Sequence, residues 1–421
     1  MGRGGAAVTA GSDKGLDDGL PSYIGFAGLW RLDLSGMPIS RLGPILEARV
    51  ARNPSDAAAM MDIATLSILT LLPENREPAF AMQSRALDLQ QIFRIPAARA
   101  PAGVKVLVIV SPGDMSAVTP LDCLVETSDV ELQMLYVRFG LGIPTDLPEH
   151  DLVFVAAGIS SGNRPILEQI AQFEKTTAKP VLNRAERILK LSRDDVSKAL
   201  RAIPGATMPA TASVERTPLE AIGAARLPLA QVLEDGIFPI IVRPFDSQGG
   251  KDLARLDGPE AVAGYLETTS SVRFFVSRFV DYKGADGFFR KYRVVMIDGR
   301  PFACHMAISS HWMIHYVNAD MDADAWKREE EARFMAEFEG SFGARHALAL
   351  RGIDAAMGLD YYAIDCAETP DGKLLVFELD TAMLVHDMDP VELYPYKRPQ
   401  MQKVFAAFRR MLEARRGTSP K

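Results

Sequence analysis

Short β-branched runs alternate with helical segments over residues 101–200, and this alternation constrains the fold more than any other feature of the sequence. The clearest run, 104–110, reads Val-Lys-Val-Leu-Val-Ile-Val and ends at Ser-Pro-Gly-Asp. The pattern predicts the same kind of strand at three later places, with one helix among them: strands over 129–139, 151–158 and 179–183, and a helix over 165–175. Strands that alternate with helices indicate a doubly wound α/β domain of about 100 residues.

Apolar residues at helical spacing occupy the segment 39–93. A helix is expected after the turn and capping residue at 53–56, and a second over 79–93, with a break at 73–78 between two prolines. The pair resembles a single tetratricopeptide hairpin, but one such repeat cannot bury its own apolar face. A plain helical extension over 21–100 is therefore favoured. Residues 1–20, rich in Gly and Asp, are expected to form a disordered leader.

From residue 201 onward the chain is rich in strands and tight turns. Strands are expected over 238–244, 272–280, 291–296, 301–309, 361–366 and 374–379. Asp298-Gly299 and Asp371-Gly372 are typical of hairpin turns. Helices are expected over 192–202, 323–340, 343–357 and 398–415. Together with the domain at 101–200, we expect two further domains, over 201–281 and 282–415.

Composition and charge narrow the class of partner. The net charge of −7 argues against nucleic acid as a partner, because phosphate binding needs a basic face. No apolar run approaches the roughly 20 residues that cross a bilayer. Cys123, Cys304 and Cys366 are isolated in the sequence and form neither a disulfide framework nor a zinc knuckle. These features predict a soluble, cytoplasmic protein with no membrane or nucleic-acid partner.

Three carboxylates flank the Asp371-Gly372 turn. Glu378 and Asp380 are two residues apart, so both side chains lie on one face of their strand. The turn can set Asp365, on the preceding strand, beside Glu378. Carboxylates that converge on apolar strands repel one another unless a cation compensates, and Mg²⁺ with oxygen ligands is one such cation. Spacing alone leaves open a second interpretation, in which the two strands are ordinary and their acids are solvated or salt-bridged.

A basic residue and a glycine-rich loop follow the strand at 238–244. Arg243 lies near the end of this strand, and the loop behind it contains Ser247, Gly249, Gly250 and Lys251. Backbone N–H groups in such a loop can lie close over phosphates, because glycine removes the side-chain barrier. Gly-Gly after a strand is also a common turn, so this loop indicates a phosphate site only together with the other candidate segments.

A third candidate segment lies at the end of the strand 272–280. Ser277, Arg278, Phe279 and Val280 could offer backbone hydrogen bonds to an adenine edge, and Arg293 opens the following strand. A guanidinium there could face phosphate or a substrate carboxylate. Without further context, a surface hairpin with solvated basic residues is the favoured explanation of this segment.

The order of these features over 104–415 resembles the ATP-grasp superfamily, and within it the branch of glutathione synthetases and ribosomal-protein glutamate ligases. Residues 183–194 resemble the segment that enters the central domain of that family, and Pro209-Ala-Thr211 resembles its proline–threonine step. The resemblance implies an ATP-grasp fold that follows the doubly wound α/β domain and the helical extension, so that the chain combines α/β and α+β architecture.

The resemblance also assigns site residues and cofactors. It implies ATP and Mg²⁺ as cofactors, with Asp365, Glu378 and Asp380 as metal ligands. Arg243 and residues 247–251 would bind the ATP phosphates, residues 277–280 would form the adenine hinge, and Arg293 would stabilise the transferred group. Arg243 and Arg293 are the implied catalytic residues.

Three positions depart from the family pattern. Arg243 replaces a lysine, Asp195 stands where a second lysine is expected, and Asp380 replaces an asparagine. Lys190 or Lys198, one helical turn away from Asp195, could substitute for the second lysine. These departures leave nucleotide binding expected and put catalytic competence in question.

His305, His311 and His315 form a cluster whose role the sequence leaves open. A zinc site is one interpretation, but the segment reads as strand and loop and offers no third ligand at zinc spacing. The other two interpretations are that these histidines face the substrate or that they pack in the core. The segment 383–390 borders the acceptor pocket by the same resemblance.

The activity implied is an ATP-dependent ligation of a carboxylate to an amine, through an acyl phosphate and without a protein nucleophile. A small-molecule kinase on the same fold, and a nucleotide-binding scaffold that has lost catalysis, are the alternatives. The partners expected are small-molecule or peptide carboxylates and amines, and a homodimer is a possible assembly.

Overall fold

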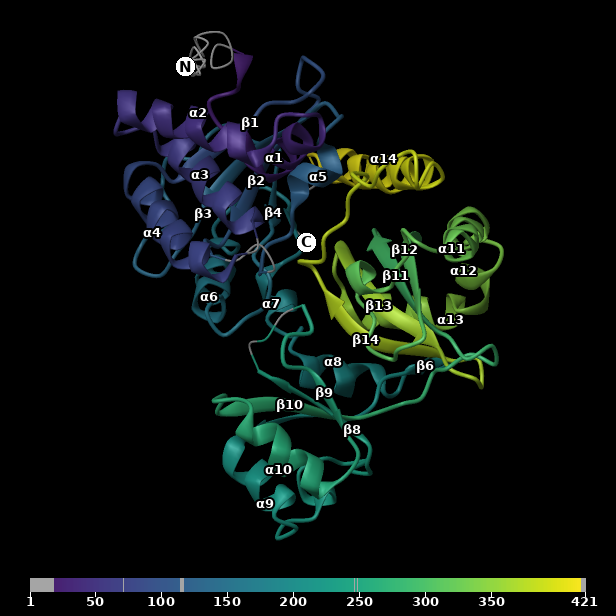
Figure 1. Cartoon of the computed structure of the whole chain (residues 1–421). Coiled ribbons are helices and arrows are strands. Elements are labelled where there is room, and N and C mark those ends of the chain that lie inside the picture. The colour runs from purple at the N-terminus through teal and green to yellow at the C-terminus, as the bar shows by residue number, and fades with distance from the viewer. Residues whose placement is uncertain (1–18, 71, 114–116, 246, 248, 418–421) are drawn as a thin grey trace, which may run out of the picture. The chain divides into compact units, whose positions relative to one another are not determined.

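The computed structural model of the chain (Figure 1) describes residues 19–70, 72–113, 117–245, 247 and 249–417. The leader predicted over 1–20 therefore lies almost wholly outside the described residues. The chain divides into two compact units, Met1–Ile95 and Pro96–Lys421. None of the described helices combines the length and the apolar character needed to cross a membrane.

Helices make up most of the first unit: α1 (Gly25–Leu34), α2 (Ile39–Arg52), α3 (Ala57–Leu69) and α4 (Pro73–Leu89). The Asp56 side chain caps α3 by accepting a hydrogen bond from the Ala59 amide. The predicted break at 73–78 is wrong, because α4 begins at Pro73 and runs through Pro78. Proline is well tolerated at the first helical position, where its missing N–H would have no partner. The predicted helix also ends early, since Ile92–Ile95 form strand β1.

The parallel strands predicted from the alternating pattern are confirmed. In the second unit, β3 (Val130–Tyr136), β2 (Val104–Val110), β4 (Leu152–Val155) and β5 (Val181–Leu182) pair in that order, all parallel. The helices that accompany them are α5 (Leu121–Val125), α6 (Arg164–Phe173) and α7 (Ala185–Ile188). Strand β4 is buried throughout, as expected where both faces of a parallel sheet are covered.

A smaller antiparallel sheet follows, in the order β7-β10-β8-β9. Its elements are β7 (Thr211–Glu215), α9 (Arg216–Gly223), β8 (Ile240–Pro244), β9 (Ala254–Leu256), α10 (Pro259–Glu267) and β10 (Arg273–Arg278). Leu219 of α9 and Val262 of α10 pack with Val242 and Phe274 of the strands in one apolar core, and Figure 1 shows both helices beside this sheet. Strands β7 and β9 are absent from the sequence-based prediction.

A third, five-stranded sheet has the order β12-β11-β13-β14-β6 and is mixed, since β14 pairs with β6 in parallel. Its strands are β6 (Ala206–Thr207), β11 (Phe289–Ile297), β12 (Arg300–Ser309), β13 (Tyr361–Glu368) and β14 (Leu374–Asp380), and its helices are α8 (Arg193–Leu200), α11 (Ala325–Glu337), α12 (Phe342–Arg345), α13 (Ala347–Met357) and α14 (Lys397–Arg415). Both predicted hairpin turns are confirmed. Asp298 and Gly299 each have positive φ, 48° and 75°, which suits the twist of the β11–β12 hairpin.

Candidate functional site: a cluster of paired charges beside a glycine turn

The three predicted metal-binding carboxylates lie on the neighbouring strands β13 and β14. Asp365 is directly opposite Glu378, and Asp380 is two residues further along the strand of Glu378. Burial, and then the negative charge of Glu378, raises the pKa of Asp380 to about 6. The register therefore places Asp365 beside Glu378, as the hairpin spacing predicted, and Asp380 on the same strand as Glu378.

Asp365 is held by two cations of β11. The Arg293 guanidinium binds both carboxylate oxygens of Asp365, with Nε to Oδ1 at 2.7 Å and Nη2 to Oδ2 at 3.0 Å. Lys291 Nζ lies 2.9 Å from Oδ2, and the Arg293 Nη1 also donates to the Leu384 carbonyl. Burial alone would raise the pKa of Asp365, but the charges of Arg293 and Lys291 outweigh it and hold the pKa well below its ordinary value.

Glu378 has its own cation, Arg193, which was not among the predicted site residues. Arg193 opens α8, where Ser192 caps the helix, and its Nη2 donates to Glu378 Oε1. Lys198, considered as a substitute for the missing lysine, has a side chain that is 62% exposed and lies 4.0 Å from the Asp194 and Asp195 carboxylates. Among these positions, it is Arg193 that reaches the carboxylates of β14.

Arg243 brings a fourth basic group to the cluster from the smaller sheet. Its side chain is buried, and it donates from Nε to Ser247 Oγ at 3.2 Å and from Nη2 to the Ser247 carbonyl. Burial, and then the positive charge of Arg193, lowers the pKa of Arg243 to about 10, while the charge of Glu378 opposes this. Arg243 thus lies within electrostatic range of both members of the Arg193–Glu378 pair.

The glycine turn consists of Gly249, Gly250 and Lys251. Both glycines have positive φ, 60° and 73°, a region that L-residues rarely adopt. Lys251 is exposed and, among the described residues, forms no ion pair. Its ammonium is therefore available to an anion at this turn.

The predicted adenine hinge lies where β10 leaves the smaller sheet. Ser277 and Arg278 end β10, and Arg278 lies 3.4 Å from Asp235. The Phe279 amide donates to the Pro239 carbonyl, and the Phe279 ring lies between the Arg255 guanidinium and the edge of Trp312. Val280 packs into the next apolar core. The chain runs from these four residues toward β11 (Phe289–Ile297), so they begin the connection between the two sheets that carry the cluster.

His305 faces Arg293 across the β11–β12 ladder. Burial, and then the charge of Arg293, lowers the pKa of His305 well below its ordinary value, so the imidazole is neutral. Its Nδ1 is buried and has no hydrogen-bond partner among the described residues. The neighbouring Cys304 has its pKa raised to about 12 by burial, so its thiol does not ionise to a nucleophile.

Within the described part of the chain, no three His, Cys, Asp or Glu side chains are arranged around a common metal position. His311 instead accepts from the Met313 amide, and His315 caps the short helix Tyr316–Asn318. The donor set on β13 and β14 consists of carboxylate oxygens alone, which suits a hard cation such as Mg²⁺. Asp365 and Glu378 are paired with cations here, so a metal would bind them only if those ion pairs separate.

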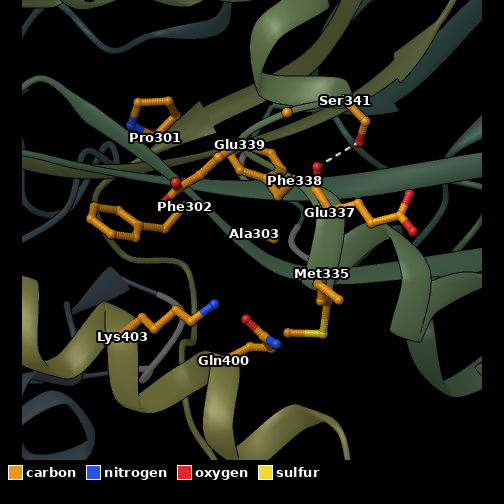
Figure 2. A pocket seen from close by; sticks show the side chains of 12 residues that line it. Pro301, Phe302, Ala303, Met335, Glu337, Phe338, Glu339, Ser341, Gln400 and Lys403 are labelled. Atoms are coloured by element: carbon orange, nitrogen blue, oxygen red, sulfur yellow. Dashed lines mark hydrogen bonds between the residues drawn. The ribbon is translucent and has the colours of Figure 1, made fainter.

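A separate pocket of about 460 Å³ lies between β12, the end of α11 and α14. Figure 2 shows Lys403 and Gln400 of α14 on one side and Phe302 with the α11 terminus on the other. Ser341 closes one edge by donating to the Glu337 carbonyl. None of the 12 lining residues belongs to the charged cluster.

Comparison with solved structures finds several similar chains. The chain is similar to a RimK-domain ATP-grasp protein from Sphaerobacter thermophilus, at 17% identity and a TM-score of 0.41, over 74% of this chain and 99% of that one. It is also similar to the VanG D-Ala:D-Ser ligase from Enterococcus faecalis, at 14% identity and a TM-score of 0.44, over 74% and 98% of the two chains.

A third similar structure is a D-alanine–D-alanine ligase from Bacillus anthracis complexed with ATP, at 13% identity and a TM-score of 0.41, over 72% of this chain and 99% of that one. No protein-family model matches the chain, and no curated protein matches it. At these identities the likeness concerns the fold alone.

Sequence reasoning missed Arg193 and Lys291 as members of the cluster. Arg193 and Glu378 are 185 residues apart, and Lys291 and Asp365 are 74 apart, so no local pattern links them. A signal for Lys291 does exist: it is two residues from Arg293, which places both side chains on the same face of β11.

Proposed function

We propose that the protein is an ATP-dependent carboxylate–amine ligase. The observation that carries this proposal is the cluster itself, in which four basic groups from α8, β8 and β11 meet three carboxylates of β13 and β14. The members are Arg193, Arg243, Lys291, Arg293, Asp365, Glu378 and Asp380. Such a set offers oxygen ligands to a hard cation and guanidinium groups to phosphate oxygens at one place.

When bound, Mg-ATP supplies the γ-phosphoryl group that activates a carboxylate as an acyl phosphate for attack by an amine. The chain's own residues bind and orient. Arg243 and the glycine turn would bind phosphate oxygens, and Arg193 would transfer from Glu378 to phosphate as Glu378 turns to the metal. Arg293, fixed on Asp365 by two hydrogen bonds, would orient the carboxylate or its activated form.

The paired state of the cluster supports coupled binding of metal and nucleotide. Arg193 forms an ion pair with Glu378, and Lys291 and Arg293 form ion pairs with Asp365. A divalent cation that binds alone would therefore find these carboxylates already neutralised. A polyphosphate alone meets guanidinium groups that already have partners. When both bind, Mg²⁺ replaces the basic groups as the partner of the carboxylates, and the phosphates replace the carboxylates as the partners of the basic groups. We therefore expect the affinity for the nucleotide to depend strongly on Mg²⁺.

Calorimetric titration of a non-hydrolysable ATP analogue, with and without Mg²⁺, tests the proposal. We expect wild type to bind in the micromolar range only with Mg²⁺, and Glu378→Gln to lose that dependence. Arg193→Ala should weaken binding by about tenfold or more, since a charge-assisted contact to phosphate is lost. Lys198→Ala is the matched control on the same helix and should bind as wild type does. Absence of binding by folded wild type, with or without Mg²⁺, would overturn the proposal.

Product analysis separates the ligase from the alternatives of a kinase and an inactive scaffold. With a panel of carboxylates and amines, a ligase releases ADP and free phosphate together with an amide. A kinase on this fold would release ADP and leave the phosphoryl group on a hydroxyl of the second substrate. The scaffold reading, favoured by Asp195 and Arg243, requires nucleotide binding without turnover of any acid and amine.

A further inference from the structure

The imidazole of His315 lies against the glycine turn. A Cβ built on Gly250 would come within 2.2 Å of His315 Nε2 and within 3.2 Å of two ring carbons. No real Cβ approaches another atom so closely, so any larger residue at position 250 would have to displace the ring. Gly250 follows β8 of the smaller sheet, whereas His315 follows β12 of the mixed five-stranded sheet. The contact therefore connects the two halves of the cluster.

The backbone that carries the His315 ring is fixed. His315 is the N-cap of the short helix Tyr316–Asn318, where its amide donates to Asn318 Oδ1 at 2.8 Å and its carbonyl accepts from the Asn318 amide at 3.1 Å. These two hydrogen bonds restrict the position from which the ring reaches Gly250.

The same ring lies beside the charged cluster. Lys291, Asp365, Glu378 and Arg243 are the charged groups whose fields act on it. The imidazole thus contacts the glycine turn and lies within electrostatic range of the paired acids and bases.

Gly249 offers a built-in comparison. It has the same backbone conformation as its neighbour, with φ of 60°, but nothing lies within 4 Å of a Cβ placed there. Alanine at either position carries a similar backbone strain. The two positions differ because a Cβ at position 250 clashes with His315, whereas a Cβ at position 249 does not.

We propose that His315 is a positioning residue: its imidazole, on a backbone fixed by Asn318, contacts Gly250 and sets the glycine turn over the charged cluster, which is why position 250 must be glycine. This proposal depends on the proposed function for one consequence alone, which is that the glycine turn binds phosphate. The contact itself can be tested without nucleotide.

Limited trypsin digestion of the full chain tests the contact directly. Lys251 is exposed and immediately follows Gly250, so cleavage after Lys251 reports how firmly the turn is held. We expect His315→Ala to speed this cleavage about tenfold, and Asn318→Ala to speed it in the same direction, because the hydrogen bond that fixes the His315 amide is lost. The control is His311→Ala, in the same loop and exposed, which should cleave at the wild-type rate. Wild-type rates in both the His315 and Asn318 variants would overturn the proposal.

Nucleotide affinity tests the steric argument through a double variant. Gly249→Ala and Gly250→Ala share the backbone strain, so we expect the latter to weaken Mg-dependent binding of the ATP analogue about tenfold more. Adding His315→Ala to Gly250→Ala removes the clash and should recover part of that difference. Equal losses in the two single variants, or no recovery in the double variant, would contradict the positioning role. If wild type binds no nucleotide, the proposed function fails, while the trypsin result still decides the contact.

Discussion

Asp62 shows how one buried residue can make the stability of the first unit depend on pH. It is fully buried in α3 and accepts hydrogen bonds from the Ile24 and Gly25 amides, at 2.9 and 3.1 Å. These bonds tie the start of α1 to the middle of α3. Burial raises the pKa of Asp62 to about 7, although the two N–H groups act in the opposite direction. The folded chain therefore holds a proton that the unfolded chain loses near the ordinary pKa of 3.8.

The sign of the pH effect follows from this difference. The contribution of Asp62 to the free energy of unfolding is greatest below about pH 4 and declines as pH rises through about 7, because the folded state binds the proton more tightly. We expect wild type to be less stable at pH 8 than at pH 5. Asp62→Asn cannot ionise, so this part of the pH dependence should disappear in that variant.

Tryptophan fluorescence during thermal unfolding can isolate this effect. Trp30 lies in α1, while Trp312 and Trp326 lie in the second unit, so replacing the latter two by Phe leaves a single probe beside Asp62. The difference in melting temperature between wild type and Asp62→Asn is then measured at both pH values. A difference that does not change between pH 5 and pH 8 would show that Asp62 does not titrate as described.

At the scale of elements, the loop after β5 is fastened to the start of β13 by Asn183. This residue is fully buried with φ of 52°, and its Oδ1 accepts from the Tyr361 and Asp360 amides at 2.8 and 3.0 Å. Its Nδ2 donates to the Tyr361 carbonyl at 2.7 Å, and its own amide donates to Asp360 Oδ2. One side chain therefore joins the parallel sheet to the strand that carries Asp365.

Replacing Asn183 should destabilise this junction. Asn183→Ala leaves buried N–H and C=O groups without partners, so we expect the free energy of unfolding to fall by about 2 kcal/mol or more. Asn183→Gly loses the same hydrogen bonds but suits the positive φ, so it should be less destabilising than alanine at the same position. Urea unfolding of the full chain measures both. An alanine variant more stable than the glycine variant would contradict the role given to the backbone conformation.

At the scale of the whole second unit, α14 packs on strands of two sheets. Phe408 is fully buried, with its ring centroid 5.8 Å from that of Phe154 on β4 and 5.3 Å from that of Tyr361 on β13. Arg409, the next residue, binds both carboxylate oxygens of Asp129 through Nε and Nη2. The C-terminal helix therefore stabilises both the parallel sheet and the sheet that carries the carboxylates.

Truncation of Phe408 should affect both sheets together. We expect Phe408→Ala to lower the free energy of unfolding by about 3–5 kcal/mol, since a fully buried aromatic side chain is lost. Hydrogen exchange should increase in β4 and β13 alike. The control is Phe139→Ala, because that side chain is 85% exposed and its loss should change stability by less than about 0.5 kcal/mol. Faster exchange in one of the two strands alone would contradict a shared dependence on α14.

The sequence by itself determined the local structure of this protein. The β-branched run at Val104–Val110, the Asp298-Gly299 turn and the two-residue spacing of Glu378 and Asp380 each depend on neighbouring residues, and the structure confirms the strand, the turn and the shared face. Local signals failed at Pro73, because proline can either break a helix or begin one. A helix break was predicted at 73–78, but Pro73 begins α4.

Only the tertiary structure decided which distant side chains meet. Arg193 pairs with Glu378, Lys291 with Asp365, and His315 lies against Gly250, although each pair is separated by 65 or more residues and shares no sequence motif. The physical reason is that strand periodicity fixes the face on which a side chain lies, whereas the order and register of the strands decide what that face opposes. The sequence thus placed the acids on one hairpin, and the fold supplied the basic groups that pair with them.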